Sequence, residues 1–127
     1  EGTDVTAVSY LHMAPMVEEA AAELGAEGVS VEVVDLRTIR PLDEEAILET
    51  ARKTGKVLVV HEDTRAGGIG GEVAAIVSEN AFEYLDGPVM RLAGPEVPAM
   101  PFSPPLEAMF LPDEDRIAGA MRRLAGY

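Results

Sequence analysis

Short apolar strands alternate with amphipathic helices along this chain, and this alternation constrains its fold more than any other feature. Strands are predicted at residues 5–10, 29–36, 56–61 and 89–93, and helices at residues 12–24, 43–54, 72–85 and from 113 onward. The third strand carries an unbroken apolar run, which is typical of parallel strands covered on both faces. The pattern therefore predicts one α/β domain with a three-layer α/β/α arrangement and a mostly parallel sheet.

The charge balance excludes several classes of partner. The 127 residues include 23 Asp and Glu against 10 Lys and Arg, which gives a formal net charge of −13. Nucleic acids and anionic membrane surfaces bind clustered basic residues, so both are excluded as partners. The negative electrostatic field of the chain would instead steer a basic protein toward it. The absence of cysteine removes disulfides and thiolate metal sites and is consistent with a cytoplasmic location.

Polar side chains gather where the predicted strands end, which is where sheets of this class bind their ligands. These residues are Tyr10, His12, Arg37, His61, Glu62 and Asp63. A metal site would need a third well-placed ligand beside the two histidines, and acid–base chemistry would need a partner within hydrogen-bond reach. The sequence favours a polar cluster that faces solvent or a neighbouring domain, and it shows no complete active site.

A glycine-rich loop at residues 65–71 follows the third strand and opens the next helix, as phosphate-binding loops do. Two residues argue against phosphate. Val73 stands where a dinucleotide fingerprint has its third glycine, and Glu72 places a negative charge at the helix start. The glycines are therefore interpreted as serving a tight turn and the close packing of a helix. Further on, the proline-rich residues 95–112 are expected to cross the surface without regular structure.

Four motifs, in register over residues 2–127, resemble one enzyme family. They are DLRTIxPLD at residues 35–43, GGIGGE at 67–72, RLxGPxxP at 91–98 and LExxFLP at 106–112. Together they are similar to the C-terminal, transketolase-like domain of the beta subunit of thiamine diphosphate-dependent 2-oxo acid dehydrogenases, of the branched-chain or pyruvate type. One departure stands at Leu11, where many members have glycine, and it leaves the shape of that loop open.

The resemblance implies a fold and a place in a larger subunit. The family sheet has five strands, and its antiparallel edge strand would precede Glu1, so we expect it to be missing here. The four remaining strands would then lie in the order 2-1-3-4, with the loops at Tyr10 and His61 meeting in one crevice that faces other domains. Residues 1–127 are expected to form a single domain of a longer polypeptide.

The resemblance also implies what this domain does. In the family, the catalytic histidine, the thiamine diphosphate contacts and the magnesium motif lie on other domains, so no catalytic, cofactor or metal residue is expected here. The implied partners are the alpha subunit, a second beta subunit and the small basic subunit-binding domain of the acyltransferase. The last is docked by acidic groups and the C-terminal carboxylate, which match Glu83, Asp86 and Tyr127 by position.

The parent enzyme would decarboxylate a 2-oxo acid and reductively acylate a lipoyl group. Residues 98–102 favour a branched-chain substrate slightly over pyruvate. Two alternatives stay open. One is the C-terminal domain of another transketolase-like enzyme. The motif that begins at Arg91 argues against this alternative. The other is a stand-alone module that binds a small regulatory molecule in the crevice at His12 and His61, for which saturable ligand binding would be evidence.

Overall fold

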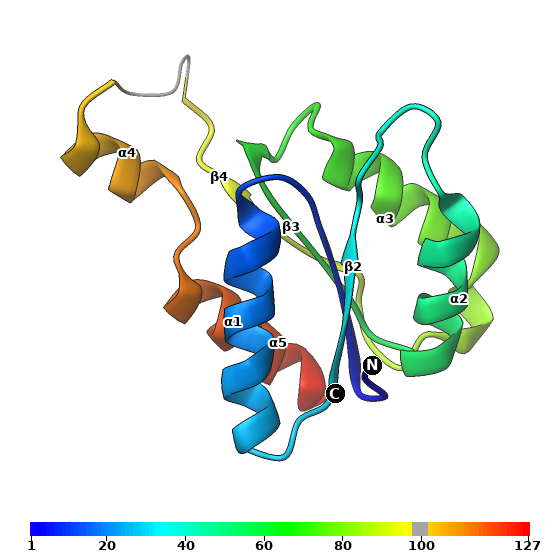
Figure 1. Cartoon of the computed structure of the whole chain (residues 1–127). Coiled ribbons are helices and arrows are strands. Elements are labelled where there is room, and N and C mark those ends of the chain that lie inside the picture. The colour runs from blue at the N-terminus through cyan, green and yellow to red at the C-terminus, as the bar shows by residue number, and fades with distance from the viewer. Residues whose placement is uncertain (98–101) are drawn as a thin grey trace.

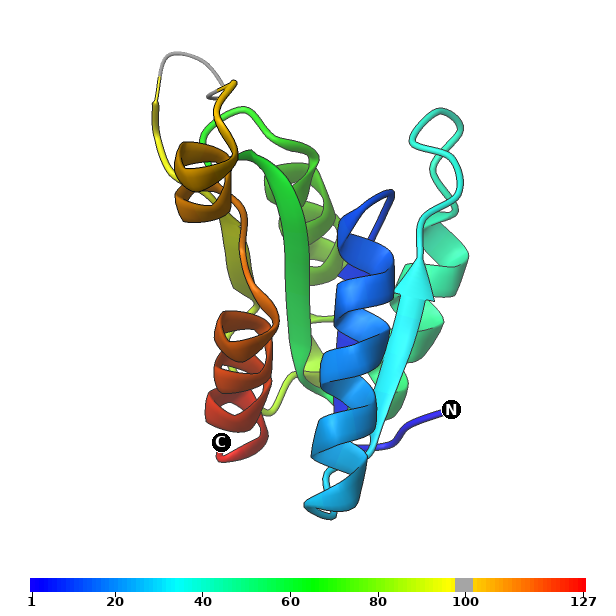
Figure 2. The same ribbon diagram turned by 60° about the vertical axis from the view of Figure 1, so that its left-hand side comes forward.

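A four-stranded parallel sheet forms the centre of the structure, a computed structural model that describes residues 1–97 and 102–127. Its strands are β1 (Val5–Ser9), β2 (Val31–Asp35), β3 (Val57–Thr64) and β4 (Met90–Gly94). They lie in the order β2-β1-β3-β4, and every adjacent pair is parallel. The predicted order is confirmed, and β2 lies at one edge of the sheet (Figure 2).

Helices cover both faces of this sheet (Figure 1). One face carries α1 (Met13–Ala26) and α5 (Glu114–Ala125), and the other carries α2 (Glu44–Thr54) and α3 (Ile69–Asn80). Side chains alternate along β3, so Leu58 and Val60 are buried in the core beneath α1 and α5. Val57 and Val59 are buried in the second core, beneath α2 and α3. The predicted three layers are confirmed.

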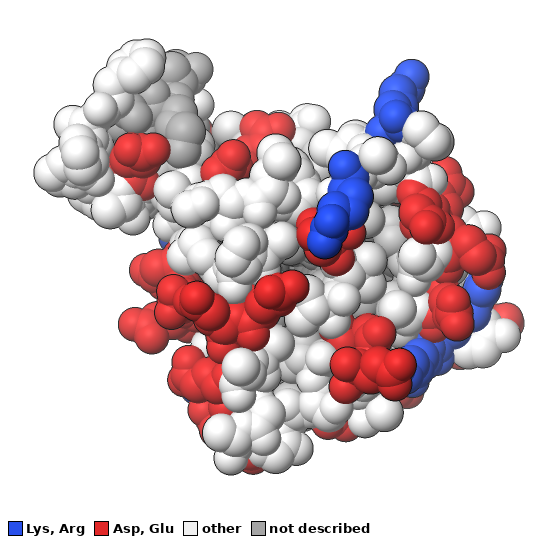
Figure 3. All heavy atoms as spheres, viewed as in Figure 1, with Lys and Arg blue, Asp and Glu red and all other residues white. Residues whose placement is uncertain are grey.

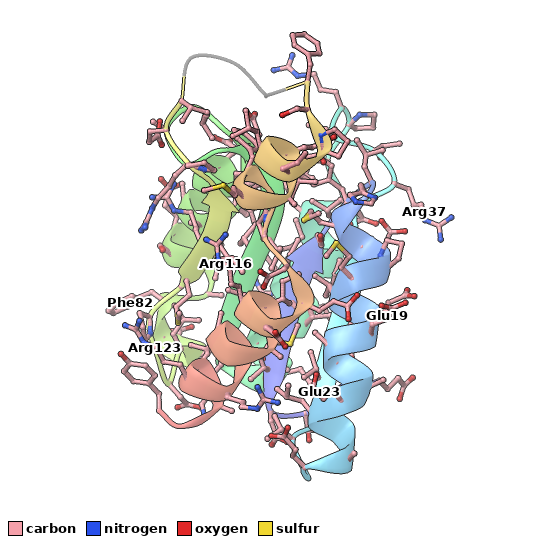
Figure 4. The ribbon with its side chains drawn as sticks, turned by 90° about the vertical axis from the view of Figure 1, so that its left-hand side faces the viewer. Glu19, Glu23, Arg37, Phe82, Arg116 and Arg123 are labelled. Atoms are coloured by element: carbon pink, nitrogen blue, oxygen red, sulfur yellow. The ribbon has the colours of Figure 1, made fainter. Side chains whose placement is uncertain are left out.

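Arg122 joins α5 to α1 at the surface of the first core. Its Nε donates to Glu27 Oε2 at 2.8 Å, and its Nη2 also donates to Glu23. The hydrogen bonds from Arg122 lower the pKa of Glu27. Figure 4 shows Glu19 and Glu23 on α1 beside α5. The neighbouring carboxyl group of Glu19 raises the pKa of Glu114, because a second negative charge close by disfavours ionisation.

The prediction that residues 95–112 lack regular structure is wrong, because helix α4 (Pro104–Phe110) forms there. Its two prolines occupy the first helical positions, where no backbone N–H is needed, so they start the helix instead of breaking it. Phe110 is buried and packs against Gly94 at the end of β4. The helix otherwise projects from the body of the domain (Figure 1).

The bounds of two predicted elements, the third helix and the third strand, also differ from the prediction. α3 begins inside the glycine-rich loop and ends at Asn80, and a short 3-10 helix, η1 (Phe82–Tyr84), follows it. β3 continues through Thr64, which pairs with Gly94 of β4, so Glu62 and Asp63 belong to the strand. Across residues 1–97 and 102–127, every helix is too short or too polar to cross a bilayer.

The loop after β1 has a backbone shape that favours glycine. Leu11 has φ of 50°, in the left-handed region, and its side chain is 74% exposed. The side chain therefore contributes little packing to offset the strain of this conformation. Leucine at this position preserves a turn that glycine would adopt without strain.

We expect Leu11→Gly to raise the free energy of unfolding by up to about 1 kcal/mol, because relief of left-handed strain outweighs the added chain entropy. Urea denaturation measures the change. Leu11→Ala is the matched control, since it removes the same exposed side chain and keeps the Cβ atom. Equal effects of the two substitutions would contradict the prediction.

Candidate functional site

His61 is fully buried, although the sequence analysis expected the cluster at the end of this strand to face solvent or another domain. The reason is the phase of β3. His61 alternates in step with Val57 and Val59, whose side chains enter the core beneath α2 and α3. The imidazole therefore points under the start of α3.

One hydrogen bond determines which nitrogen of this imidazole carries the proton. Nδ1 lies 3.2 Å from the carbonyl oxygen of Asp63, and because a carbonyl only accepts, Nδ1 carries the proton and donates. Within the part of the chain that the structure describes, Nε2 has no hydrogen-bond partner. Burial lowers the pKa of His61, and the charge of Arg91 lowers it further, against the opposing effect of Asp63. His61 is therefore a neutral side chain.

Two glycines allow α3 to lie directly on this ring. A Cβ atom at Gly70 would lie 2.3 Å from His61 Nε2, and one at Gly68 would lie 2.8 Å from Cε1. Both distances are far below van der Waals contact, so any side chain would push the helix off the sheet. Close helix packing, the interpretation favoured from the sequence, is what Gly68 and Gly70 provide.

The structure brings together four of the six predicted strand-end residues. The ring of Tyr10 stacks on that of His61, with 6.4 Å between centroids and 26° between planes. Burial raises the pKa of Tyr10, and the nearby carboxylates of Asp63 and Glu62 raise it further. The loops after β1 and β3 therefore meet, but they meet in a packed contact between rings.

The other two strand-end residues lie apart from this contact. His12 is exposed at the start of α1. Arg37 is exposed on the loop after β2, where its Nε donates to Asp35 at 2.6 Å. It lines a small hollow of about 360 Å³ together with Leu11 and Glu18. In residues 1–97 and 102–127, His, Cys, Asp and Glu side chains form no group of three that could hold a metal ion.

The three predicted docking residues lie around the turn after α3. Glu83 and Asp86 line a shallow hollow of about 560 Å³ together with Phe82. Tyr127 packs against Gly87, where an added Cβ would lie 3.2 Å from the Tyr127 Cβ, so it adjoins Asp86. We call Phe82, Glu83, Asp86 and Tyr127 the acidic–aromatic face.

Phe82 is the residue of this face that the sequence analysis missed. Its side chain is 75% exposed and projects from the domain (Figure 4). The sequence placed it inside a helix at residues 72–85, where its exposure could not be deduced. Next to it, Tyr84 is held by Arg52, whose guanidinium lies 5.9 Å from the ring centroid.

Comparison with known proteins identifies the family. The family described as "Transketolase, C-terminal domain" matches residues 1–117. The chain belongs to this family. A solved structure described as "Split gene transketolase, inactive beta4 tetramer" superposes with a TM-score of 0.83 at 32% identity, over 99% of this chain and 39% of that one.

Curated relatives of this transketolase C-terminal domain are beta subunits. The 2-oxoisovalerate dehydrogenase subunit beta of Bacillus subtilis (strain 168) is 50% identical over 127 residues, which is 100% of this chain and 39% of that protein. The mitochondrial pyruvate dehydrogenase E1 component subunit beta of Dictyostelium discoideum is 42% identical over 98% of this chain and 35% of its own length. The chain thus spans well under half of the length of each of these relatives. The predicted resemblance to 2-oxo acid dehydrogenase beta subunits is confirmed.

We expect Gly70→Ala to lower the free energy of unfolding by about 1–3 kcal/mol, because its Cβ would overlap the buried His61 ring. Gly119→Ala is the matched control, since Gly119 lies inside α5 with nothing within 4 Å of the added Cβ. That substitution should stabilise by up to about 1 kcal/mol through helix propensity. Chemical denaturation of both variants checks the pair, and a tolerated Gly70→Ala would contradict the packing.

Stability should fall as the pH drops below about 6.5, the ordinary pKa of histidine. The unfolded chain then binds a proton at His61 that the folded chain, with its lowered pKa, does not bind. Between about pH 7.5 and 5.5, His61→Gln should show a shallower loss of unfolding free energy than the unsubstituted chain. His12→Gln is the control at an exposed position, and parallel curves for all three proteins would refute a neutral His61.

Proposed function

We propose that this domain is the assembly and partner-docking domain of the beta subunit of a 2-oxo acid dehydrogenase. The acidic–aromatic face is the observation that carries the proposal. Its exposed Phe82 supplies an apolar anchor, and Glu83 and Asp86 supply negative charge beside it. Aromatic anchors ringed by polar groups dominate the energy of many protein interfaces.

The charge of the domain supports a basic partner. A net charge of −13 attracts basic proteins over a distance, and Figure 3 shows acidic side chains spread over much of one face. The partner proposed is the small basic subunit-binding domain of the acyltransferase. The alpha subunit and a second beta subunit are proposed to contact other surfaces of the domain, in the cytoplasm.

The parent enzyme is proposed to decarboxylate a 2-oxo acid and to transfer the acyl group reductively to a lipoyl group. Thiamine diphosphate, with magnesium, would supply the carbanion chemistry for decarboxylation. The residues described here do not fit that group, since they form no carboxylate or histidine cluster for the metal, so we assign it to other domains. A branched-chain substrate is favoured by residues 98–102, of which 98–101 lie outside the described residues.

Asp86→Lys should weaken binding of the acyltransferase subunit-binding domain roughly tenfold, because it replaces attraction by repulsion next to Phe82. Isothermal titration calorimetry with the two isolated proteins measures the affinity. Glu18→Lys is the matched control, since it makes the same charge change on an exposed position of α1. If both variants bind equally well, the face is not the docking site.

A further inference from the structure

A large hollow lies at the end of the sheet where the strands terminate. It has a volume of about 1030 Å³ and is bounded by the loop after β2, the glycine-rich loop and the start of α3. Helix α3 separates it from the acidic–aromatic face, because the hollow adjoins the first turn of α3 and that face follows its last turn. The docking role proposed above therefore leaves this hollow without a function.

Three arginines from distant parts of the sequence line the hollow: Arg40, Arg65 and Arg91. Arg40 and Arg65 are exposed on the two loops, whereas Arg91 is half-buried on β4. Its Nη1 donates to the carbonyl oxygen of Arg65 at 3.2 Å and lies 3.5 Å from the position of a Cβ at Gly71. The guanidinium of Arg91 is thus held in place, and the glycine leaves it open on that side.

These arginines are unusual because the chain has more than two acids for each base. Elsewhere, four basic side chains are paired with carboxylates, those of Arg37, Arg52, Lys53 and Arg122. Lys56 donates to the carbonyl oxygen of Ala125 instead, and in the described part of the chain Arg116 and Arg123 on α5 also have no carboxylate within 4.0 Å. Within residues 1–97 and 102–127, no carboxylate oxygen lies within 4.0 Å of the guanidinium nitrogens of Arg40, Arg65 or Arg91. Three unpaired cations therefore share one hollow in an acidic protein.

Acidic residues also line the hollow and limit how strongly it can attract an anion. Glu96 is engaged, since its Oε1 accepts the backbone N–H of Ala66 at 2.8 Å. Glu72 stands in the first turn of α3, and Glu44 in the first turn of α2. Removal of the Glu72 charge should therefore strengthen any anion site here, which provides a test in the opposite direction from loss of an arginine.

We propose that this hollow binds a small organic anion, a carboxylate or a phosphate, through the guanidinium groups of Arg40, Arg65 and Arg91. Guanidinium groups match the geometry of both anions and form paired hydrogen bonds with them. Ile39, Ile69 and Ile76 line the same hollow and would contact an apolar part of the ligand. The sequence argued against phosphate from the glycine-rich loop alone, whereas Arg40 and Arg91 come from outside that loop.

Titration of the isotope-labelled domain with inorganic phosphate and, separately, with isovalerate tests the site by NMR at constant ionic strength. We expect saturable shifts at the amides of Gly67, Gly68 and Gly71. Saturation by phosphate alone assigns a phosphate ligand, saturation by isovalerate alone assigns a carboxylate, and saturation by both assigns a general anion site. Shifts that stay linear with both probes would overturn the proposal.

Variants give the test its specificity. Arg91→Gln and Arg40→Gln should each weaken binding roughly tenfold, and Glu72→Gln should tighten it severalfold. Arg40 is exposed on a loop, so its variant decides the result if Arg91→Gln fails to fold. Arg116→Gln is the matched control for charge, on α5 (Figure 4), and should bind as the unsubstituted domain does. Equal weakening of anion binding by Arg116→Gln and Arg40→Gln would contradict the site. The result of this titration is independent of whether the acyltransferase docks at the acidic–aromatic face.

Discussion

The close approach of helix α3 to strand β3 is the contact on which the rest of the structure depends. Gly68 and Gly70 let the first turn of α3 rest on the ring of His61, which is buried and neutral. This contact covers the end of β3, and no helix side chain lies between the backbone of α3 and the imidazole ring. It also fixes the course of the glycine-rich loop, whose Arg65 carbonyl then accepts the hydrogen bond that positions Arg91.

An all-parallel sheet gives this domain two structurally different ends. All four strands terminate at the same end, so the loops after β2 and β3 enclose the hollow with its arginines. The acidic–aromatic face lies where η1 leads the chain back to the start of β4, beside the end of α5. A ligand at one end and a protein partner at the other would not compete for the same surface.

The fold could be predicted from local sequence patterns because residues close together in the sequence determine where helices and strands form. The apolar run of β3 and the amphipathic helices define the layers, and the motifs shared with 2-oxo acid dehydrogenase beta subunits give the strand order. The prediction of irregular structure at residues 95–112 failed because it rested on the number of prolines and not on their positions. Pro104 and Pro105 occupy the first turn of α4, where proline is compatible with a helix. The burial of His61 could have been deduced from its phase with Val57 and Val59. The convergence of Arg40, Arg65 and Arg91 could not, because it depends on tertiary packing alone.

The mass of the native polypeptide in the cells that produce it tests the account most directly. The central claim is that these 127 residues act as a domain of a beta subunit; they make up 39% of the Bacillus subtilis relative and 35% of the Dictyostelium discoideum relative. Mass spectrometry of the intact protein should give a mass far above the 13.5 kDa of this chain. A native product of 13.5 kDa would contradict the claim and would favour a stand-alone binding module.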